Sequence, residues 1–242
     1  MKKGTFALFL MIINIMISGC QKEQIVSPPI NSKEEIMNKR EMKSKKITVW
    51  TTYWDTRNLD KEFENLKENI DEVCFFAAYF NEKKEPFIPE ETIESYEIVK
   101  KKYEDFQFTS YLTFVNDVQN QRGNTSLKDT EILYSFFSNR KTMNAHIEDI
   151  LRMTIEGGFD GIEIDYEAIK KDEKLWGLYI QFIKELYEKG KEKGLLVRIL
   201  LEPNTPTEKI AFPKGPEYVM MCYNLHGYGT NPGPKATPDF LK

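Results

Sequence analysis

Acidic side chains crowd one short stretch of the sequence, GGFDGIEIDYEAI, at residues 157–169. Alternate side chains of a β-strand point to the same face, so Glu163, Asp165 and Glu167 would share one face, with the residues between them on the other. Carboxylates spaced about 6.6 Å apart repel one another and lose hydration when they are buried. We therefore expect the pKa of at least one to be raised, and a carboxyl that is protonated near neutral pH can act as a general acid.

The alternative is an edge strand with one hydrated face, on which these carboxylates would be ordinary surface charge. The apolar character of the neighbouring runs argues against it. So does the position of Glu167 at the C-terminal end of the predicted strand, because barrel enzymes build their active sites at that end.

Strand-like and helix-like segments alternate along the rest of the chain. Apolar runs predict strands over 47–54, 71–80, 106–115, 159–167, 195–203 and 217–224. Amphipathic runs predict helices over 59–70, 89–103, 142–156 and 173–193. Strands that alternate with helical or loop crossovers predict an α/β fold with a parallel sheet covered on both faces, as in a barrel or a doubly wound domain.

The start of the chain predicts an export signal. In residues 1–20, two lysines precede an apolar run that is too short to span a bilayer comfortably. The run ends in ISGC, which resembles the lipobox of bacterial lipoproteins and would make Cys20 the lipidated N-terminus. A chance cysteine or an uncleaved membrane anchor is the alternative. Residues 21–45 lack apolar periodicity and predict a flexible tether before a folded unit at 46–242.

Charge separates the tether from the folded unit. Residues 21–46 contain seven Lys or Arg and four Glu, whereas residues 47–242 contain 25 basic and 34 acidic side chains. A basic tether beside a lipid anchor suits an anionic membrane surface, and a merely solvated linker is the alternative. The acidic charge of the folded unit argues against nucleic acid as a partner. We expect a lipid-anchored, extracytoplasmic protein at a cell surface or in a periplasm. Cys74 and Cys222 lie in apolar runs and are expected to be buried free thiols.

Two motifs together resemble a known family. DGIEIDYE, at 160–167, resembles the DGxDxDxE signature of family 18 glycoside hydrolases, the chitinase-like (β/α)8 barrels. MCYN, at 221–224, resembles their sixth-strand MxY(D/N) element. The motifs occur in the family's order and on the expected strands. The resemblance spans about residues 46–228 and implies a TIM-barrel type of fold.

The resemblance also implies a chemistry, namely substrate-assisted, retaining hydrolysis of β-1,4 bonds in glycans that contain N-acetylglucosamine. Glu167 would be the general acid and base. Asp165 would orient the 2-acetamido group and stabilise the oxazolinium that forms when this group attacks the anomeric carbon. Tyr223 would donate a hydrogen bond to the acetamido oxygen, and Asn224 would lie beside it where Asp is more common. Neither a protein nucleophile nor a metal or other cofactor is implied.

Other residues are weaker candidates for substrate binding. Aromatic side chains that end the first strand stack on a sugar face in the family, although these, like Tyr223, could instead belong to the core. His146 and His226 lack metal-ligand spacing and are expected to be structural. The candidates are Tyr53, Trp54, Asn116, Asp160, Glu163 and Glu202.

Three features depart from the family's pattern. Glu163 stands where a second Asp is usual and adds a methylene to a crowded row. The third strand reads SYLTFVND and lacks the SxGG element of typical chitinases, so chitin is not the obvious substrate. A closed eight-stranded barrel takes about 250 residues and the family's late tryptophan is missing, so we expect a C-terminally incomplete barrel.

Two functions remain open from the sequence. The first is a monomeric glycosidase acting on peptidoglycan, chitin oligomers or N-glycan cores. The second is a non-catalytic glycan-binding lipoprotein, because chitinase-like proteins lose activity readily. The presence of Glu167 favours the enzyme, because inactive relatives are usually recognised by the loss of this acid.

Overall fold

The structure is a computed structural model that describes residues 45–52, 54, 58–103, 108–120, 125–203, 205–223, 225–227 and 229–240. The chain divides into two units, Met1–Lys45 and Lys46–Lys242, and the second contains the features below. Cys20 and nearly all of the predicted tether lie outside the described residues. Within the described ranges, none of the helices combines the length and apolar character needed to cross a bilayer.

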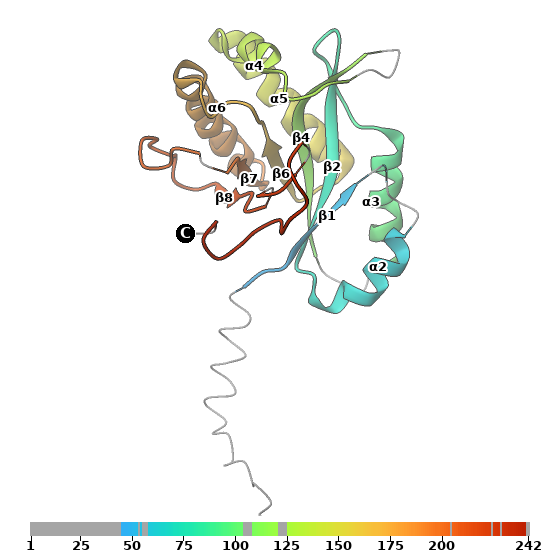
Figure 1. The fold of residues 1–242 in the computed structure, drawn as a ribbon. Helices are drawn as coiled ribbons and strands as arrows, with labels where there is room; N and C mark the ends of the chain where they lie inside the picture. Colours follow the sequence, from blue (N-terminus) through green and yellow to red (C-terminus); the bar gives the residue numbers. More distant parts are fainter. Residues whose placement is uncertain are drawn as a thin grey trace, which may run out of the picture. The chain divides into compact units, whose positions relative to one another are not determined.

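Parallel strands form the curled sheet that carries the acidic stretch (Figure 1). Their order is β1-β2-β4-β6-β7-β8, and each neighbouring pair is parallel. This arrangement confirms the predicted TIM-barrel type of α/β fold, with six such strands in the described residues. Because β6 lies between β4 and β7, the alternative of an edge strand with a hydrated face is wrong. The strands are β1 (Thr48–Thr52), β2 (Glu72–Asn81), β4 (Thr109–Gln119), β6 (Gly161–Asp165), β7 (Leu196–Leu201) and β8 (Glu217–Met220).

Two short strands that the sequence analysis did not predict extend the sheet. β3 (Pro86–Phe87) pairs antiparallel with β2, and β5 (Thr125–Ser126) pairs antiparallel with β4. Val115 of β4 pairs with Asp165, the last residue of β6, so β4 continues beyond its partner. This extension places Asn116 and Asp117 beside the chain that follows β6.

The predicted helices are present, with small shifts at their ends. The asparagine Asn139 begins α5 by accepting hydrogen bonds from two backbone N–H groups, and Gly158 ends it at φ 73°, a conformation that favours glycine. The helices are α2 (Leu59–Leu66) with the 3-10 turn η2 (Lys67–Asn69), α3 (Glu90–Lys102), α5 (Arg140–Gly157) and α6 (Glu173–Glu192).

One helix, α4 (Thr130–Phe137), was missed by the sequence analysis. Its eight residues, TEILYSFF, are too few and too continuously apolar for their periodicity to separate helix from strand. The available signal was Asp129, whose side chain accepts hydrogen bonds from the backbone N–H groups of Glu131 and Ile132.

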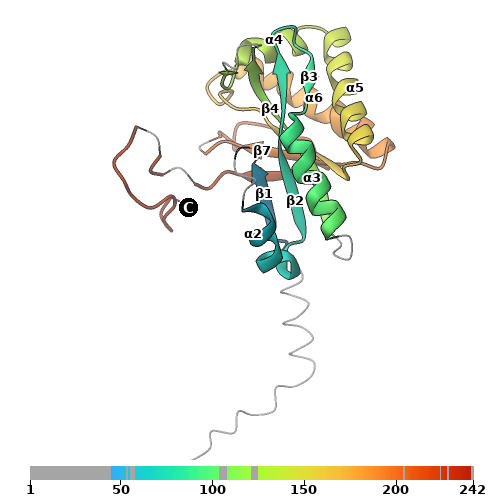
Figure 2. The ribbon, with the colours of Figure 1, turned by 90° about the vertical axis from the view of Figure 1, so that its right-hand side faces the viewer.

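The main core lies between the sheet and its helices. Ile162, Ile164 and Tyr166 of the acidic stretch are buried there, together with Ile150 of α5 and Phe182 of α6. This confirms that the residues between the carboxylates face the helices. Figure 2 shows α5 and α6 on one side of the sheet and the chain after β8 on the other.

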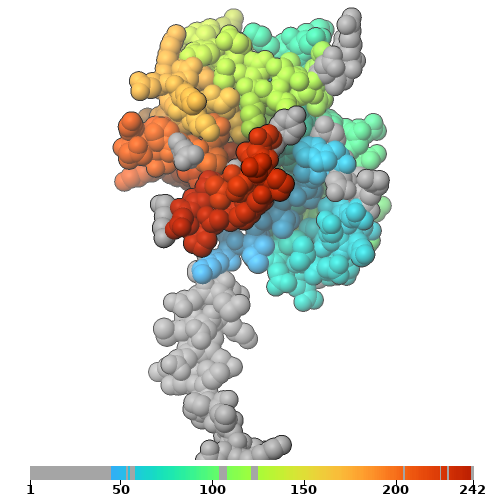
Figure 3. Space-filling view, in the orientation of Figure 1, coloured from blue at the N-terminus to red at the C-terminus, as the bar shows by residue number. Residues whose placement is uncertain are grey.

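The chain after β8 projects from the sheet in Figure 2. In the space-filling view, which is turned by 90° from Figure 2, the same segment lies in front of the sheet (Figure 3). Cys222 is the second residue of this segment and is exposed, so the prediction that it is buried is wrong. The strand ends at Met220, two residues earlier, and the side chain leaves the core with the chain. Cys74 of β2 is a buried free thiol, as predicted.

His146 of α5 is a buried aromatic element of this core. Its ring stacks on Phe136, and its Nε2 lies 2.8 Å from the hydroxyl of Tyr166. Burial lowers the pKa of His146 from 6.5 to about 3, so the folded protein keeps the ring neutral. The unfolded chain binds a proton below pH 6.5, and this contribution to stability is therefore complete above pH 6.5 and is lost as the pH falls toward 3.

We expect the free energy of unfolding of His146→Phe to fall less than that of the wild type as the pH is lowered. The variant loses a hydrogen bond to Tyr166 and should be less stable than the wild type at pH 7.5, but the difference should shrink by about 3 kcal/mol on going to pH 4.5. Urea unfolding at both pH values measures this change. Parallel losses of stability in the two proteins would contradict a neutral, buried His146.

Candidate active site

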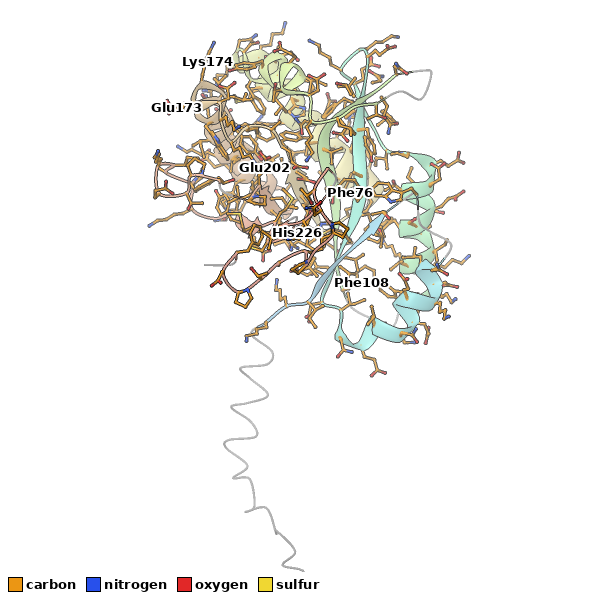
Figure 4. All side chains as sticks on the ribbon, in the orientation of Figure 1. Phe76, Phe108, Glu173, Lys174, Glu202 and His226 are labelled. Atoms are coloured by element: carbon orange, nitrogen blue, oxygen red, sulfur yellow. The ribbon has the colours of Figure 1, made fainter. Side chains whose placement is uncertain are left out.

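A hollow opens at the C-terminal ends of the strands, on the side of the sheet away from α5 and α6. It has a volume of about 540 Å³, and Asp165 supplies its carboxylate. A second hollow of about 260 Å³ adjoins it, because both are bounded by Trp54, Phe76 and Asp165. Figure 4 labels Phe76 on β2. The two hollows together form a groove with aromatic walls and with the carboxylate of Asp165 at the point where they meet.

Asp165 ends β6 with its side chain in this groove. The residue is 8% exposed, and its Oδ1 atom is buried without a hydrogen-bond partner among the described residues. Burial raises the pKa of Asp165 well above its ordinary value, and the negative charges of Glu167 and Glu163 raise it further. The predicted rise in the pKa of at least one carboxyl is therefore confirmed, and a buried polar atom without a partner is left for a ligand to satisfy.

Glu167 follows β6 and lies in the smaller hollow. Its Oε2 accepts a hydrogen bond from Lys128 Nζ at 2.5 Å, in an ion pair whose lysine is half exposed. The side chain of Asn116 bonds to the backbone of Glu167 at two points, by accepting from its N–H (2.9 Å) and donating to its carbonyl (3.1 Å). The Glu167 carboxylate thus borders the groove on a backbone that is held in place.

Glu163 is enclosed by protein groups and is fully buried. Its carboxylate accepts hydrogen bonds from Trp50 Nε1 (2.8 Å), Thr113 Oγ1 (2.7 Å) and Cys74 Sγ (3.2 Å). Arg198 Nε lies 3.3 Å from Oε2. Burial raises the pKa of Glu163, against these hydrogen bonds and the charge of Arg198. Because Glu163 contacts four protein side chains and has no exposed area, it is placed to hold neighbouring residues of the site in position rather than to touch a ligand.

Arg198 of β7 is the centre of a buried ion-pair network. It lies between Glu163, its partner in strand register, and Glu72 of β2, whose Oε2 accepts from Arg198 Nη1 at 2.8 Å. The guanidinium also lies over the rings of Trp50 and Tyr111, at 5.5 and 5.3 Å from their centroids. These contacts compensate the charge of a residue that is only 3% exposed.

Aromatic side chains bound the groove and are partly open to solvent. Trp54 is 59% exposed and contacts Phe76 edge to face, and Tyr223 is 48% exposed. The alternative that Trp54 or Tyr223 belongs to the core is therefore wrong. Burial of its hydroxyl and the charge of Asp165 raise the pKa of Tyr223, so the phenol stays protonated and can donate a hydrogen bond.

The remaining candidates lie at different places. Asp160 is at the opposite end of β6, where its carboxylate accepts hydrogen bonds from the N–H (2.8 Å) and hydroxyl (2.7 Å) of Ser110, so it is not part of the groove. Glu202, labelled in Figure 4, follows β7 and pairs with Lys170 at 3.6 Å. Tyr53 and Asn224 lie outside the described residues. Within the described ranges, no cluster of His, Cys, Asp or Glu could hold a metal ion.

The geometry can be compared with known proteins. No family model and no curated protein sequence matches the chain. The fold resembles that of solved chitinases. The crystal structure of a chitinase from Chromobacterium violaceum superposes with a TM-score of 0.61 at 14% identity, over 81% of this chain and 62% of that one. A class V chitinase from Pseudomonas fluorescens gives a TM-score of 0.63 at 17% identity, over 81% and 61% of the two chains.

A second kind of neighbour degrades another material. The spore cortex-lytic enzyme of Bacillus cereus superposes with a TM-score of 0.62 at 15% identity, over 81% of this chain and 46% of that one. The chain therefore spans less than two thirds of each of these neighbours. Identities this low establish a shared fold and leave the activity to be argued from the groove itself.

Three residues of the site were missed from the sequence, and two of them left a signal. Trp50 lies two and four residues before Thr52 and Trp54, which also line the groove, so the period of two in β1 could have identified it. Arg198 interrupts an apolar strand and requires a buried carboxylate nearby. Lys128 lies between β5 and α4 in a connection without periodicity, and no sequence signal pointed to it.

Proposed function

We propose that the protein is a glycosidase that cleaves β-1,4 bonds in glycans containing N-acetylglucosamine. The observation that carries this proposal is the pairing of Asp165 and Glu167: a buried carboxyl with a raised pKa and a free oxygen adjoins a second carboxylate in one aromatic-walled groove. Aromatic rings suit the apolar faces of sugars, and paired carboxyl groups suit glycoside hydrolysis.

In the proposed mechanism, Glu167 is the general acid that protonates the leaving oxygen and later the base that activates water. The acetamido carbonyl of the substrate attacks the anomeric carbon, so a positive oxazolinium forms and configuration is retained. Burial and the neighbouring carboxylates raise the pKa of Asp165 in the empty groove, and positive charge developing beside it favours its ionised form. The stabilisation it provides therefore grows toward the transition state, which is what accelerates a reaction. Tyr223 supplies a donor for the acetamido oxygen.

A non-catalytic glycan-binding function is the second candidate. The observation that favours it is the ion pair of Lys128 with Glu167, which occupies one oxygen of the proposed acid. The same aromatic walls would then hold a glycan without cleaving it. Turnover by the full-length chain separates the two functions, because binding without turnover supports only this one.

The test of the glycosidase proposal compares two substrates with the same chromogenic leaving group, an N-acetylglucosamine oligomer and the matching glucose oligomer. Acetamido-assisted catalysis predicts turnover of the first and none of the second, because glucose lacks the attacking carbonyl. Equal turnover of both would reject the acetamido step. Binding of the N-acetylglucosamine oligomer without turnover would reject the enzyme.

We also propose that the protein works at a membrane surface, outside the cytoplasm. The support is the lysine-initiated apolar run that ends in ISGC and the basic segment after it. Peptidoglycan, chitin oligomers and N-glycan cores are the candidate substrates at such a location. The solved spore cortex-lytic enzyme, whose fold this chain resembles, is a precedent for this fold in a lytic enzyme.

A further inference from the structure

Asn116 has an unusual set of partners for a side chain beside a groove. Its amide accepts from Glu167 N–H at 2.9 Å and donates both to Glu167 O at 3.1 Å and to Asp129 O at 3.2 Å. Its own backbone carbonyl accepts from Asp129 N–H at 2.8 Å. The residue is 1% exposed. Both ends of the amide are therefore used by the protein, and little surface is left for a ligand.

The two segments that Asn116 joins each contain a residue in the left-handed region. Ala168, directly after Glu167, has φ 64°, and Lys128, directly before Asp129, has φ 54°. This conformation is unfavourable for residues other than glycine and persists where surrounding contacts fix it. The amide of Asn116 bonds to the neighbour of each strained residue and supplies such contacts.

The hydrogen bonds of Asn116 to Glu167 and Asp129, here called the junction, also determine where Lys128 lies. Asp117, the next residue of β4, accepts a hydrogen bond from Lys128 N–H at 2.7 Å, so consecutive residues of β4 hold consecutive residues of the connection to α4. Lys128 Nζ then reaches Glu167 Oε2. The backbone of Glu167 and the lysine that contacts its carboxylate are thus fixed by the same extension of β4.

We propose that Asn116 is the positioning residue of the acid: its amide holds the backbone of Glu167, and the segment that carries Lys128, in the geometry needed to protonate a leaving oxygen. This inference rests on the proposed function. It replaces the prediction that Asn116 binds substrate, because the amide is buried and its donors and acceptor bond to backbone groups. A misplacement of about 1 Å is enough to lower a rate by ~100-fold, so loss of the junction should impair proton transfer selectively.

The test uses N-acetylglucosamine oligomers with two aryl leaving groups, one that departs without protonation and one that requires it. Asn116→Ala should lower kcat/KM by ~100-fold for the poor leaving group and by less than about threefold for the activated one. Asn139→Ala is the matched control, because the side chain of Asn139 also bonds to backbone groups, here the N–H groups of Lys141 and Thr142, but this residue begins α5, away from the groove. Its kcat/KM values should not depend on the leaving group. Equal losses with both leaving groups in Asn116→Ala would overturn the proposal.

Hydrogen exchange keeps this inference separate from the proposed function. The amide of Glu167 should exchange faster in Asn116→Ala than in the wild type, and at the wild-type rate in Asn139→Ala. Unchanged exchange in Asn116→Ala would overturn the positioning role even if the wild type is active. An inactive wild type would reject the proposed function together with the catalytic consequence of the junction. If Asn116→Ala does not fold, Asn116→Asp takes its place, because it is nearly isosteric and keeps the acceptor. It should show the same dependence of kcat/KM on the leaving group, but a smaller one. If kcat/KM of Asn116→Asp does not depend on the leaving group, the proposal is overturned.

Discussion

Replacing Glu167 with glutamine is expected to lower kcat/KM for an N-acetylglucosamine oligomer by about 10²- to 10⁴-fold, the range attributed to a positioned proton donor. Glutamine keeps the size of the side chain and can still lie beside Lys128, but it has no acidic proton. The fold should be unaffected, because the side chain is at the edge of the groove and its ion-pair partner is half exposed. Initial rates with an unactivated leaving group measure the effect.

The control for Glu167→Gln is Glu185→Gln on α6. Glu185 is also mostly buried, with a side chain 14% exposed, and also pairs with a basic residue, Arg140, at 3.7 Å. It lies on a helix on the far side of the sheet, so kcat/KM should stay within about twofold of the wild type. Equal activity of Glu167→Gln and Glu185→Gln would mean that Glu167 is not the acid.

The second large effect is on stability. Arg198→Met should lower the free energy of unfolding by about 3–5 kcal/mol, because it leaves Glu163 buried without a cation and leaves Glu72 with Lys46 alone. For a folded unit of this size, the loss corresponds to a fall in melting temperature of roughly 10 °C. Thermal unfolding followed by circular dichroism measures it.

Arg152→Met is the matched control for this prediction. Arg152 on α5 also pairs with two carboxylates, Asp149 and Glu156, but its side chain is 52% exposed. Exposed pairs contribute about 0–1 kcal/mol, so the melting temperature should change little. The double variant Glu163→Gln, Arg198→Met should recover part of the loss. If Arg198→Met has the same melting temperature as the wild type, the buried network does not stabilise the sheet.

The strand pattern made much of the sheet predictable. A strand period of two separated Glu163 and Asp165 from Ile162 and Ile164, and the structure places the two pairs on opposite faces. The parallel arrangement of the strands followed from their alternation with helices. The elements that the sequence analysis did not predict are short. The helix α4 and the hairpin strands β3 and β5 have too few residues for a period to be recognised.

The site was only partly predictable, because its electrostatics depend on contacts between distant segments. The sequence indicated that carboxylates would perturb one another, but not that Arg198 would pair with Glu163 and leave Asp165 with a free buried oxygen. The role of Asn116 was also inaccessible. It depends on the extension of β4 beyond β6 and on a connection whose left-handed residue, Lys128, is not a glycine.

The longer side chain of Glu163 has a physical account in the structure. The sequence raised the question of whether a glutamate in place of the usual aspartate would disturb the acidic row. Its carboxylate is held by Trp50, Thr113, Cys74 and Arg198 together. The carboxylate of Glu163 is thus fixed in position, and its charge contributes to the raised pKa of Asp165.

The central proposal, hydrolysis assisted by the acetamido group, is tested most directly by the configuration of the first product. Proton NMR can follow the anomeric signals while the full-length protein cleaves a β-1,4-linked N-acetylglucosamine oligomer, before mutarotation equilibrates them. Attack by the acetamido carbonyl followed by water inverts the anomeric carbon twice, so the β anomer should appear first. Initial formation of the α anomer, or no cleavage above the protein-free rate, would contradict the account.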